Sequence, residues 1–150
     1  MNVALALWNE VDLLSFSSPG QLFARAGEGS AFFVYTVAEA RHPITSEDFL
    51  TIVPEFTIEE SPRPDVLVVP AGGAYYVAHR KALLAWLAEA VQAARVVLAT
   101  ADGVHILRAA GVPGVPDPFA RPGDDRAPGE ADAEPPSEIV EQGKFVVAAS

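Results

Sequence analysis

Four short runs of the chain consist almost wholly of apolar residues and are rich in valine and leucine. Such runs are typical of strands in a parallel sheet, because both faces of those strands are covered. Turn-forming residues punctuate the chain between them. The predicted strands are residues 3–8, 31–37, 65–70 and 95–100, with a shorter edge strand at 51–54 with Phe56 and a closing hairpin at 138–140 and 144–149.

Three other segments predict helices. Residues 76–94 place apolar side chains three and four positions apart, which is the spacing of an amphipathic helix. A second helix is expected to begin near Pro19, with Ser17 and Ser18 as N-cap candidates. A third, short helix is expected at residues 104–110, where Gly111 provides a C-cap.

The alternation of strands with helices predicts an α/β fold with a doubly wound, mostly parallel, flavodoxin-like sheet. Residues 1–150 are expected to form a single domain. In such sheets ligands bind beyond the carboxyl ends of the strands. The turns after Trp8, Pro70 and Thr100 are therefore the places to look for a site.

The composition changes sharply between residues 112 and 136. This segment holds seven of the thirteen prolines and six acidic residues, with almost no large apolar side chain. Such a segment cannot bury enough surface to offset the entropy of ordering it. We expect a flexible loop, with a solvated spacer as its default role and partner binding or a lid as the alternative.

Charge and cysteine usage narrow the function. The net charge of −10 argues against nucleic acid and against an anionic membrane surface. No apolar run reaches the roughly 18 residues that a membrane helix needs. The chain has no cysteine, which removes disulfides, thiolate metal sites and thiol nucleophiles together. A cytoplasmic protein without cofactors is the expectation.

An ordered series of motifs resembles the ThiJ/PfpI superfamily, which has the class I glutamine amidotransferase-like fold. The subgroup that it most resembles contains the isonitrile hydratases and the sensor domains of some transcription regulators. The resemblance covers about residues 3–111 and 138–150. The segments that carry it are VDLLSFSSPGQLF (11–23), FVYTVAE (33–39), DVLVVPAGG (65–73), LLAWL (83–87), AAG (109–111) and KFVVA (144–148).

The chain departs from this family where the family performs its chemistry. Counting back from residues 109–111, the family's nucleophilic cysteine falls on Ala101, whose methyl group cannot attack a substrate. The acid that assists the cysteine falls on Ser15 in the hydratase-like subgroup and on Gln21 in other branches. The family's last helices are missing, so the C-terminal part is expected to be shortened. The resemblance therefore implies the fold without the familiar thiol chemistry.

Several residues near the three turns are candidates for a site. Gly72 matches the family's oxyanion-hole glycine, and its N–H and that of Asp102 are candidates to hold an anion, although residues 71–73 also read as a simple tight turn. Asp102 reads as a helix N-cap or as a general base at the pocket mouth. His105 lies one helical turn further and is either its partner or an ordinary surface side chain.

The remaining candidates also have both a functional and a structural interpretation. Ser15 is a nucleophile only if a base stands beside it, and otherwise it belongs to a turn. Tyr75 and Tyr76 wall a pocket or begin a helix, and Asn9 and Glu10 share that ambiguity at the end of the first strand. His42 and His79 lie on separate segments without ligand spacing, so no metal site is expected. The predicted ligand-binding set is Gly72, Gly73, Ala101, Asp102, Gln21 and Tyr75.

Besides a purely structural or regulatory subunit, two functions remain open. One is a catalytically degenerate member that binds a small molecule or a protein partner. The other is an enzyme that uses Asp102, His105 or Ser15 for non-covalent acid–base work such as hydration, isomerisation or cyclisation. The family often dimerises, and missing C-terminal helices would leave part of the sheet uncovered. A homodimer is therefore expected in either case.

Overall fold

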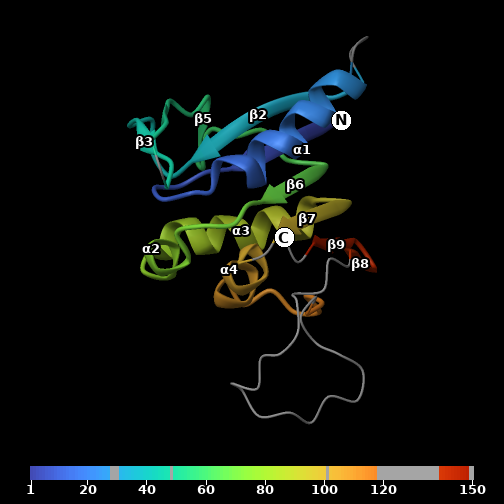
Figure 1. Cartoon of the computed structure of the whole chain (residues 1–150). Coiled ribbons are helices and arrows are strands. Elements are labelled where there is room, and N and C mark those ends of the chain that lie inside the picture. Colours follow the sequence, from blue (N-terminus) through green and yellow to red (C-terminus); the bar gives the residue numbers. More distant parts are fainter. Residues whose placement is uncertain (28–30, 48, 101, 118–138, 149–150) are drawn as a thin grey trace, which may run out of the picture.

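The computed structural model describes residues 1–27, 31–47, 49–100, 102–117 and 139–148. Within them, seven strands form one sheet in the order β5-β2-β1-β6-β7-β9-β8, with helices on both sides (Figure 1). The strands of this sheet are β1 (Asn2–Ala6), β2 (Phe33–Ala38), β5 (Phe56–Thr57), β6 (Val66–Val69), β7 (Val96–Thr100), β8 (Ile139–Gln142) and β9 (Phe145–Ala148).

The centre of the sheet is parallel, as the apolar runs predicted. β1 lies between β2 and β6, and β7 follows on the far side of β6. All four residues of β6 are buried, and so are Val3 to Ala6 in β1. The mostly parallel, flavodoxin-like α/β fold is thus confirmed, and the turns after β1, β6 and β7 share one edge of the sheet.

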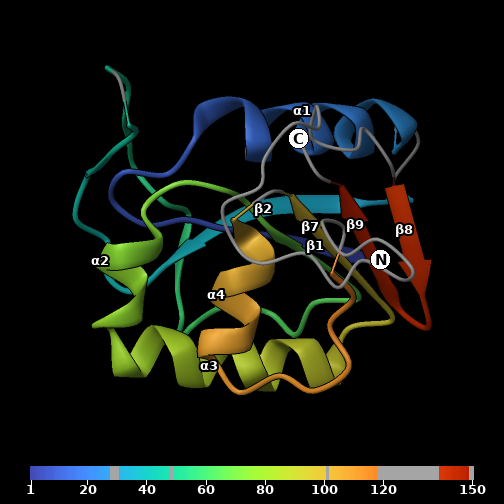
Figure 2. The same cartoon turned by 60° about the horizontal axis from the view of Figure 1, so that its bottom comes forward.

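The helices divide unequally between the two faces. Figure 2 shows α1 (Leu13–Ala26) on one side of the sheet, and α2 (Ala74–Ala78), α3 (Lys81–Ala93) and α4 (Gly103–Ala109) on the other. α1 packs against β1, β2 and β6. α4 packs against β6 and β7 on the opposite face.

The first helix begins earlier than predicted. Asp12, and neither Ser17 nor Ser18, is its N-cap, because the Asp12 carboxylate accepts a hydrogen bond from the Ser15 backbone N–H at 3.2 Å. Pro19 lies inside this helix rather than at its start. The buried positions Phe16 and Gly20 lie one turn apart, and their packing outweighs the backbone bond that Pro19 cannot make.

Two further expectations need correction. The helix predicted at residues 76–94 is two helices, α2 and α3, because Arg80 leaves the helical conformation with φ −108° and ψ 85°. The predicted edge strand at 51–54 is also divided. β4 (Thr51–Ile52) pairs antiparallel with β3 (Ile44–Thr45) in a separate small sheet, whereas β5 forms the edge of the main sheet.

The C-terminal hairpin is confirmed. β8 and β9 pair antiparallel, and β9 joins the main sheet parallel to β7. Residues 112–117, at the start of the predicted loop, form turns after α4, and residues 118–136 lie outside the described part of the chain.

Candidate functional site

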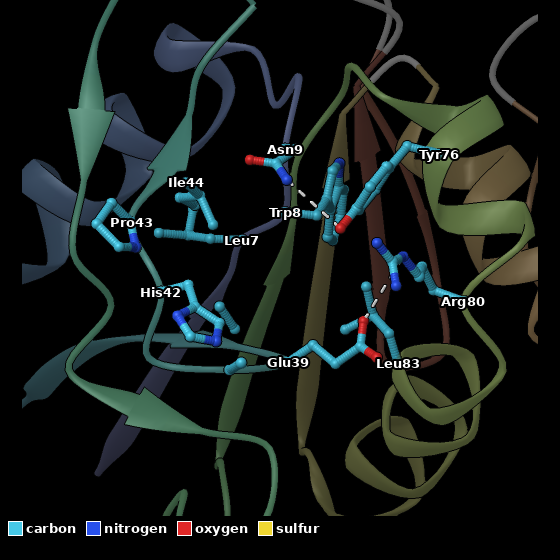
Figure 3. Close-up of a pocket in the computed structure, with 12 residues that line it drawn as sticks. Leu7, Trp8, Asn9, Glu39, His42, Pro43, Ile44, Tyr76, Arg80 and Leu83 are labelled. Atoms are coloured by element: carbon cyan, nitrogen blue, oxygen red, sulfur yellow. Dashed lines mark hydrogen bonds and ion pairs between the residues drawn. The ribbon is translucent and has the colours of Figure 1, made fainter.

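A cavity of about 380 Å³ lies beyond the carboxyl ends of β1 and β2. The segment directly after β1 supplies three consecutive residues to it, the segment after β2 supplies one wall, and α2 and α3 supply the other (Figure 3). Its lining residues are Leu7, Trp8, Asn9, Ala38, Glu39, Ala40, His42, Pro43, Ile44, Tyr76, Arg80 and Leu83. The volume is in the range of small-molecule sites.

Trp8 anchors the inner wall of the cavity. The residue is 2% exposed, and its indole N–H donates to the Gly72 carbonyl oxygen at 2.8 Å. Gly72 and Gly73 have φ of 86° and 64°, a left-handed conformation that side chains disfavour. A Cβ on Gly72 would lie 2.5 Å from the Glu10 carbonyl oxygen. The turn after β6 is therefore pressed directly onto the turn after β1.

Asn9 connects the two walls of the cavity. Its side-chain oxygen accepts from the Thr45 backbone N–H at 3.1 Å, and its Nδ2 lies 3.5 Å from the Tyr76 hydroxyl (Figure 3). The Glu10 backbone N–H adds a bond to the Thr45 carbonyl oxygen at 2.9 Å. The β3 region and α2 are thus held at fixed positions by the residues that follow β1.

Two opposite charges meet in the cavity. Arg80 Nε lies 4.0 Å from Glu39 Oε2, and the two side chains are 45% and 35% exposed. The Arg80 guanidinium also stacks over the Tyr76 ring, 4.6 Å from its centroid. A cation held over an aromatic face gains stability and a fixed orientation. The ring of Tyr76 therefore positions Arg80 beside the cavity.

Beyond Glu39, the wall formed by residues 42–44 is apolar apart from one imidazole. Figure 3 shows His42, Pro43 and Ile44 across the cavity from Tyr76 and Arg80. Leu7 and Leu83, both buried, complete the apolar lining. An apolar space with a few convergent polar groups is the usual form of a ligand site. The arrangement can bind a molecule by burial and charge, with Asn9 and Tyr76 as further hydrogen-bonding groups.

The residues predicted from the family's chemistry lie elsewhere. Gly72 and Gly73 form the turn after β6, behind Trp8. Ser15 lies in the first turn of α1, where its hydroxyl donates to the Asp12 carboxylate, and Gln21 is exposed further along that helix. Of the predicted catalytic and ligand-binding sets, no residue that the structure describes lines the cavity, whereas Asn9 and Tyr76, which the sequence left open as pocket residues, both do.

The turn between β7 and α4, here called the elbow because the family's nucleophilic cysteine falls there, lies further along the same edge. Asp102 occupies the N-cap position of α4, but its side chain makes no capping hydrogen bond. Asp102 and His105 are both exposed. Tyr75 is 81% exposed and its ring lies 4.7 Å from that of His79. Ala101 lies outside the described residues, so its predicted role stays a prediction.

Sequence reasoning missed Glu39 and Arg80 altogether. Glu39 directly follows β2, whose carboxyl end lies beside that of β1, so the rule applied to the other turns would have found it. Arg80 gave no such signal, because it lay inside what read as one continuous helix. Only the break between α2 and α3 brings it to the cavity.

Two further features bear on the class of site. Among the described residues, no group of three histidine, cysteine or acidic side chains is arranged to hold a metal ion. No helix in the described part of the chain is long and apolar enough to cross a membrane.

The fold and the arrangement of turns define a member of a known class. The profile of the DJ-1/PfpI family matches residues 1–114, and the chain belongs to this family. A comparison with curated proteins finds no match.

Solved structures with the same fold are distant in sequence. A ThiJ/PfpI family protein from Pseudomonas syringae superposes with a TM-score of 0.74 at 22% identity, over 99% of this chain and 62% of that protein. A two-domain protein from Anabaena variabilis, with DJ-1/ThiJ/PfpI-like and ferritin-like domains, gives 0.72 at 15% identity, over 99% and 44%. DJ-1 from Schizosaccharomyces pombe gives 0.69 at 13% identity, over 99% and 83%. The chain thus spans less than two thirds of the first two.

Proposed function

We propose that this chain is a catalytically degenerate member of the DJ-1/PfpI family that binds a small molecule non-covalently in the cavity beyond β1 and β2. The observation that carries the proposal is the cavity itself, in which the turn after β6 fixes Trp8 through Gly72 and Asn9 lies within 3.5 Å of the Tyr76 hydroxyl. The absence of cysteine from the chain removes the nucleophile on which the family's familiar chemistry depends.

A cavity-filling substitution tests this proposal. Ala40 is exposed yet lines the cavity, so Ala40→Trp is expected to fill the space without unfolding the chain. Ala24→Trp, at an exposed position of α1, is the matched control. Fragments from a diverse set are screened by ligand-observed NMR. Their binding should disappear in Ala40→Trp and persist in Ala24→Trp. Equal binding by both variants would place the ligand outside the cavity.

A homodimer is the second part of the proposal, and a part of the sheet that no described helix covers supports it. The register places Val96 and Leu98 of β7 on the same face as Val146 of β9. This is the face that α1 covers. Leu5 contacts α1 at Gly20. The register places Leu5 beside Val68 and Val68 beside Leu98, so these side chains share one face of the sheet. α1 covers β1, β2 and β6, while Val96, Leu98 and Val146 stay partly exposed. A second copy would bury this apolar face.

Sedimentation velocity tests the dimer. Leu98→Lys places a charge on the open face and is expected to shift the protein from dimer to monomer at micromolar concentration. Leu22→Lys changes a leucine that is 70% exposed on α1 and should leave the assembly unchanged. A monomeric unmodified protein, or a dimer that survives Leu98→Lys, would contradict this surface.

A further inference from the structure

We propose that the cavity selects a small zwitterion of the α-amino acid type, with an apolar or aromatic side chain; this inference rests on the proposed function. The charges that face the cavity are Arg80 and Glu39, with the imidazole of His42 on the opposite wall. Arg80 and Glu39 lie 4.0 Å apart, at the outer limit of an ion pair, and both are partly exposed. A pair of this kind holds its partners weakly, so a ligand can take both over.

Charge balance distinguishes a zwitterion from a singly charged ligand. A carboxylate that approached Arg80 alone would also face the negative charge of Glu39. An ammonium that approached Glu39 alone would face Arg80 in the same way. An α-amino acid carries a carboxylate and an ammonium on one carbon, so it presents each group to its opposite charge at once. The closely spaced pair in the protein is complementary to the closely spaced pair in such a ligand.

The geometry of Arg80 favours a carboxylate on its side of the cavity. The planar guanidinium donates paired hydrogen bonds that match the two oxygens of a carboxylate. Its stacking on Tyr76, 4.6 Å from the ring centroid, limits the positions that this plane can take. Asn9 holds Tyr76 in turn, through Nδ2 at 3.5 Å from the hydroxyl. The recognition group is therefore supported from the turn after β1.

The remaining surface of the cavity defines the other end of the ligand. Leu7, Ile44 and Leu83 are buried apolar side chains of the lining, and the cavity measures about 380 Å³. Burial of a hydrocarbon or aromatic group there removes apolar surface from water, which favours binding. A polar or highly charged side chain would find few partners on these walls. The charged pair thus selects α-amino acids as a class. The apolar walls select those with an apolar or aromatic side chain.

Three probes that share one aromatic tail test the inference. L-phenylalanine carries both charges, 3-phenylpropanoate only the carboxylate, and 2-phenylethylamine only the ammonium. Calorimetric titration should show L-phenylalanine binding at least about tenfold more tightly than either singly charged probe, as expected for one added charge-assisted contact. Arg80→Gln should remove the higher affinity of L-phenylalanine relative to 2-phenylethylamine. Glu39→Gln should remove its higher affinity relative to 3-phenylpropanoate.

Controls separate this inference from the proposed function. Arg41→Gln removes an exposed arginine that pairs with Glu60 outside the cavity, and it should leave all three affinities unchanged. Melting curves of each variant establish that it is folded. If 3-phenylpropanoate binds as tightly as L-phenylalanine and Glu39→Gln strengthens both, the zwitterion is wrong, although the cavity still binds a ligand. If neither these probes nor any fragment depends on Ala40, both proposals fall.

Discussion

Two places along one sheet edge differ in how firmly their polar groups are held. At the elbow after β7, Asp102 is exposed and makes no capping bond. At the cavity after β1 and β2, Trp8, Asn9 and Arg80 are each fixed by a hydrogen bond or a ring contact. Groups that are fixed before a ligand arrives lose less freedom on binding. The preorganised part of this edge is therefore at β1 and β2, two to three strands away from the position of the family's elbow.

The largest expected effect comes from the glycine turn that supports the cavity. Gly72→Ala combines a φ of 86° with a Cβ only 2.5 Å from the Glu10 oxygen and 2.6 Å from the Asp12 nitrogen, so backbone must move. We expect the free energy of unfolding to fall by about 3 kcal/mol or more. Ligand binding should be lost as well. Gly111→Ala, with φ 78° and open space around it, is the control and should cost about 1 kcal/mol. Equal losses in urea denaturation would mean that the contact between the turns is unimportant.

The next effect isolates the tryptophan. Trp8→Phe keeps an aromatic ring but removes the N–H that donates to Gly72 at 2.8 Å, which leaves a carbonyl oxygen short of a partner. A loss of about 1–3 kcal/mol in unfolding free energy is expected, with weaker binding of any cavity ligand. The same change at Trp86, a partly exposed ring on α3 outside the cavity, should affect stability less and binding not at all. Denaturant unfolding and ligand titration of both variants measure these effects. A larger effect of Trp86→Phe than of Trp8→Phe would contradict the role given to Trp8.

The smallest effects are expected from the aspartates that begin α1 and α4. Asp12→Ala loses a carboxylate that accepts bonds from Ser15 and should cost about 1 kcal/mol. Asp102→Ala loses no capping bond and should stay within about 0.5 kcal/mol of the parent. Thermal unfolding measures both.

The same elbow variants test the competing enzyme hypothesis. Asp102→Ala and His105→Ala should leave cavity binding unchanged. If the protein turned over a substrate and either variant abolished that turnover, acid–base catalysis at the elbow would replace the binding function proposed here.

The framework of the sheet was predictable because it depends on local sequence. The runs at 3–8, 65–70 and 95–100 are apolar on both faces, and only central strands tolerate that pattern. The start of α1 was predicted too late, because Ser17 and Ser18 near Pro19 gave a stronger local signal than Asp12. The Asp12 cap depends on the hydrogen bond from the Ser15 backbone N–H, which is seen only in the three-dimensional structure.

The candidate site was less predictable because it depends on contacts between distant segments. Trp8 meets Gly72, and Glu39 meets Arg80, across 64 and 41 positions respectively. The resemblance to the family directed attention to Ala101, Ser15 and Gln21, which are the positions of its catalytic groups. Where those groups are absent, the resemblance predicts the fold and gives no information about the cavity. The helix break at Arg80 had no clear signal in the periodicity.

The pressed contact between the turns after β1 and β6 has a consequence for how this protein can be diversified. The Glu10 backbone leaves no room for a Cβ on Gly72, and the Asn9 backbone leaves none for a Cβ on Gly73, so the turn after β6 cannot vary freely although it is a loop. The segment around His42 and Pro43 is exposed and is attached at Thr45, beyond the residues that face the cavity. A library randomised at residues 40–43 would therefore change ligand preference on a constant scaffold, whereas one at residues 71–73 would mostly yield unfolded clones.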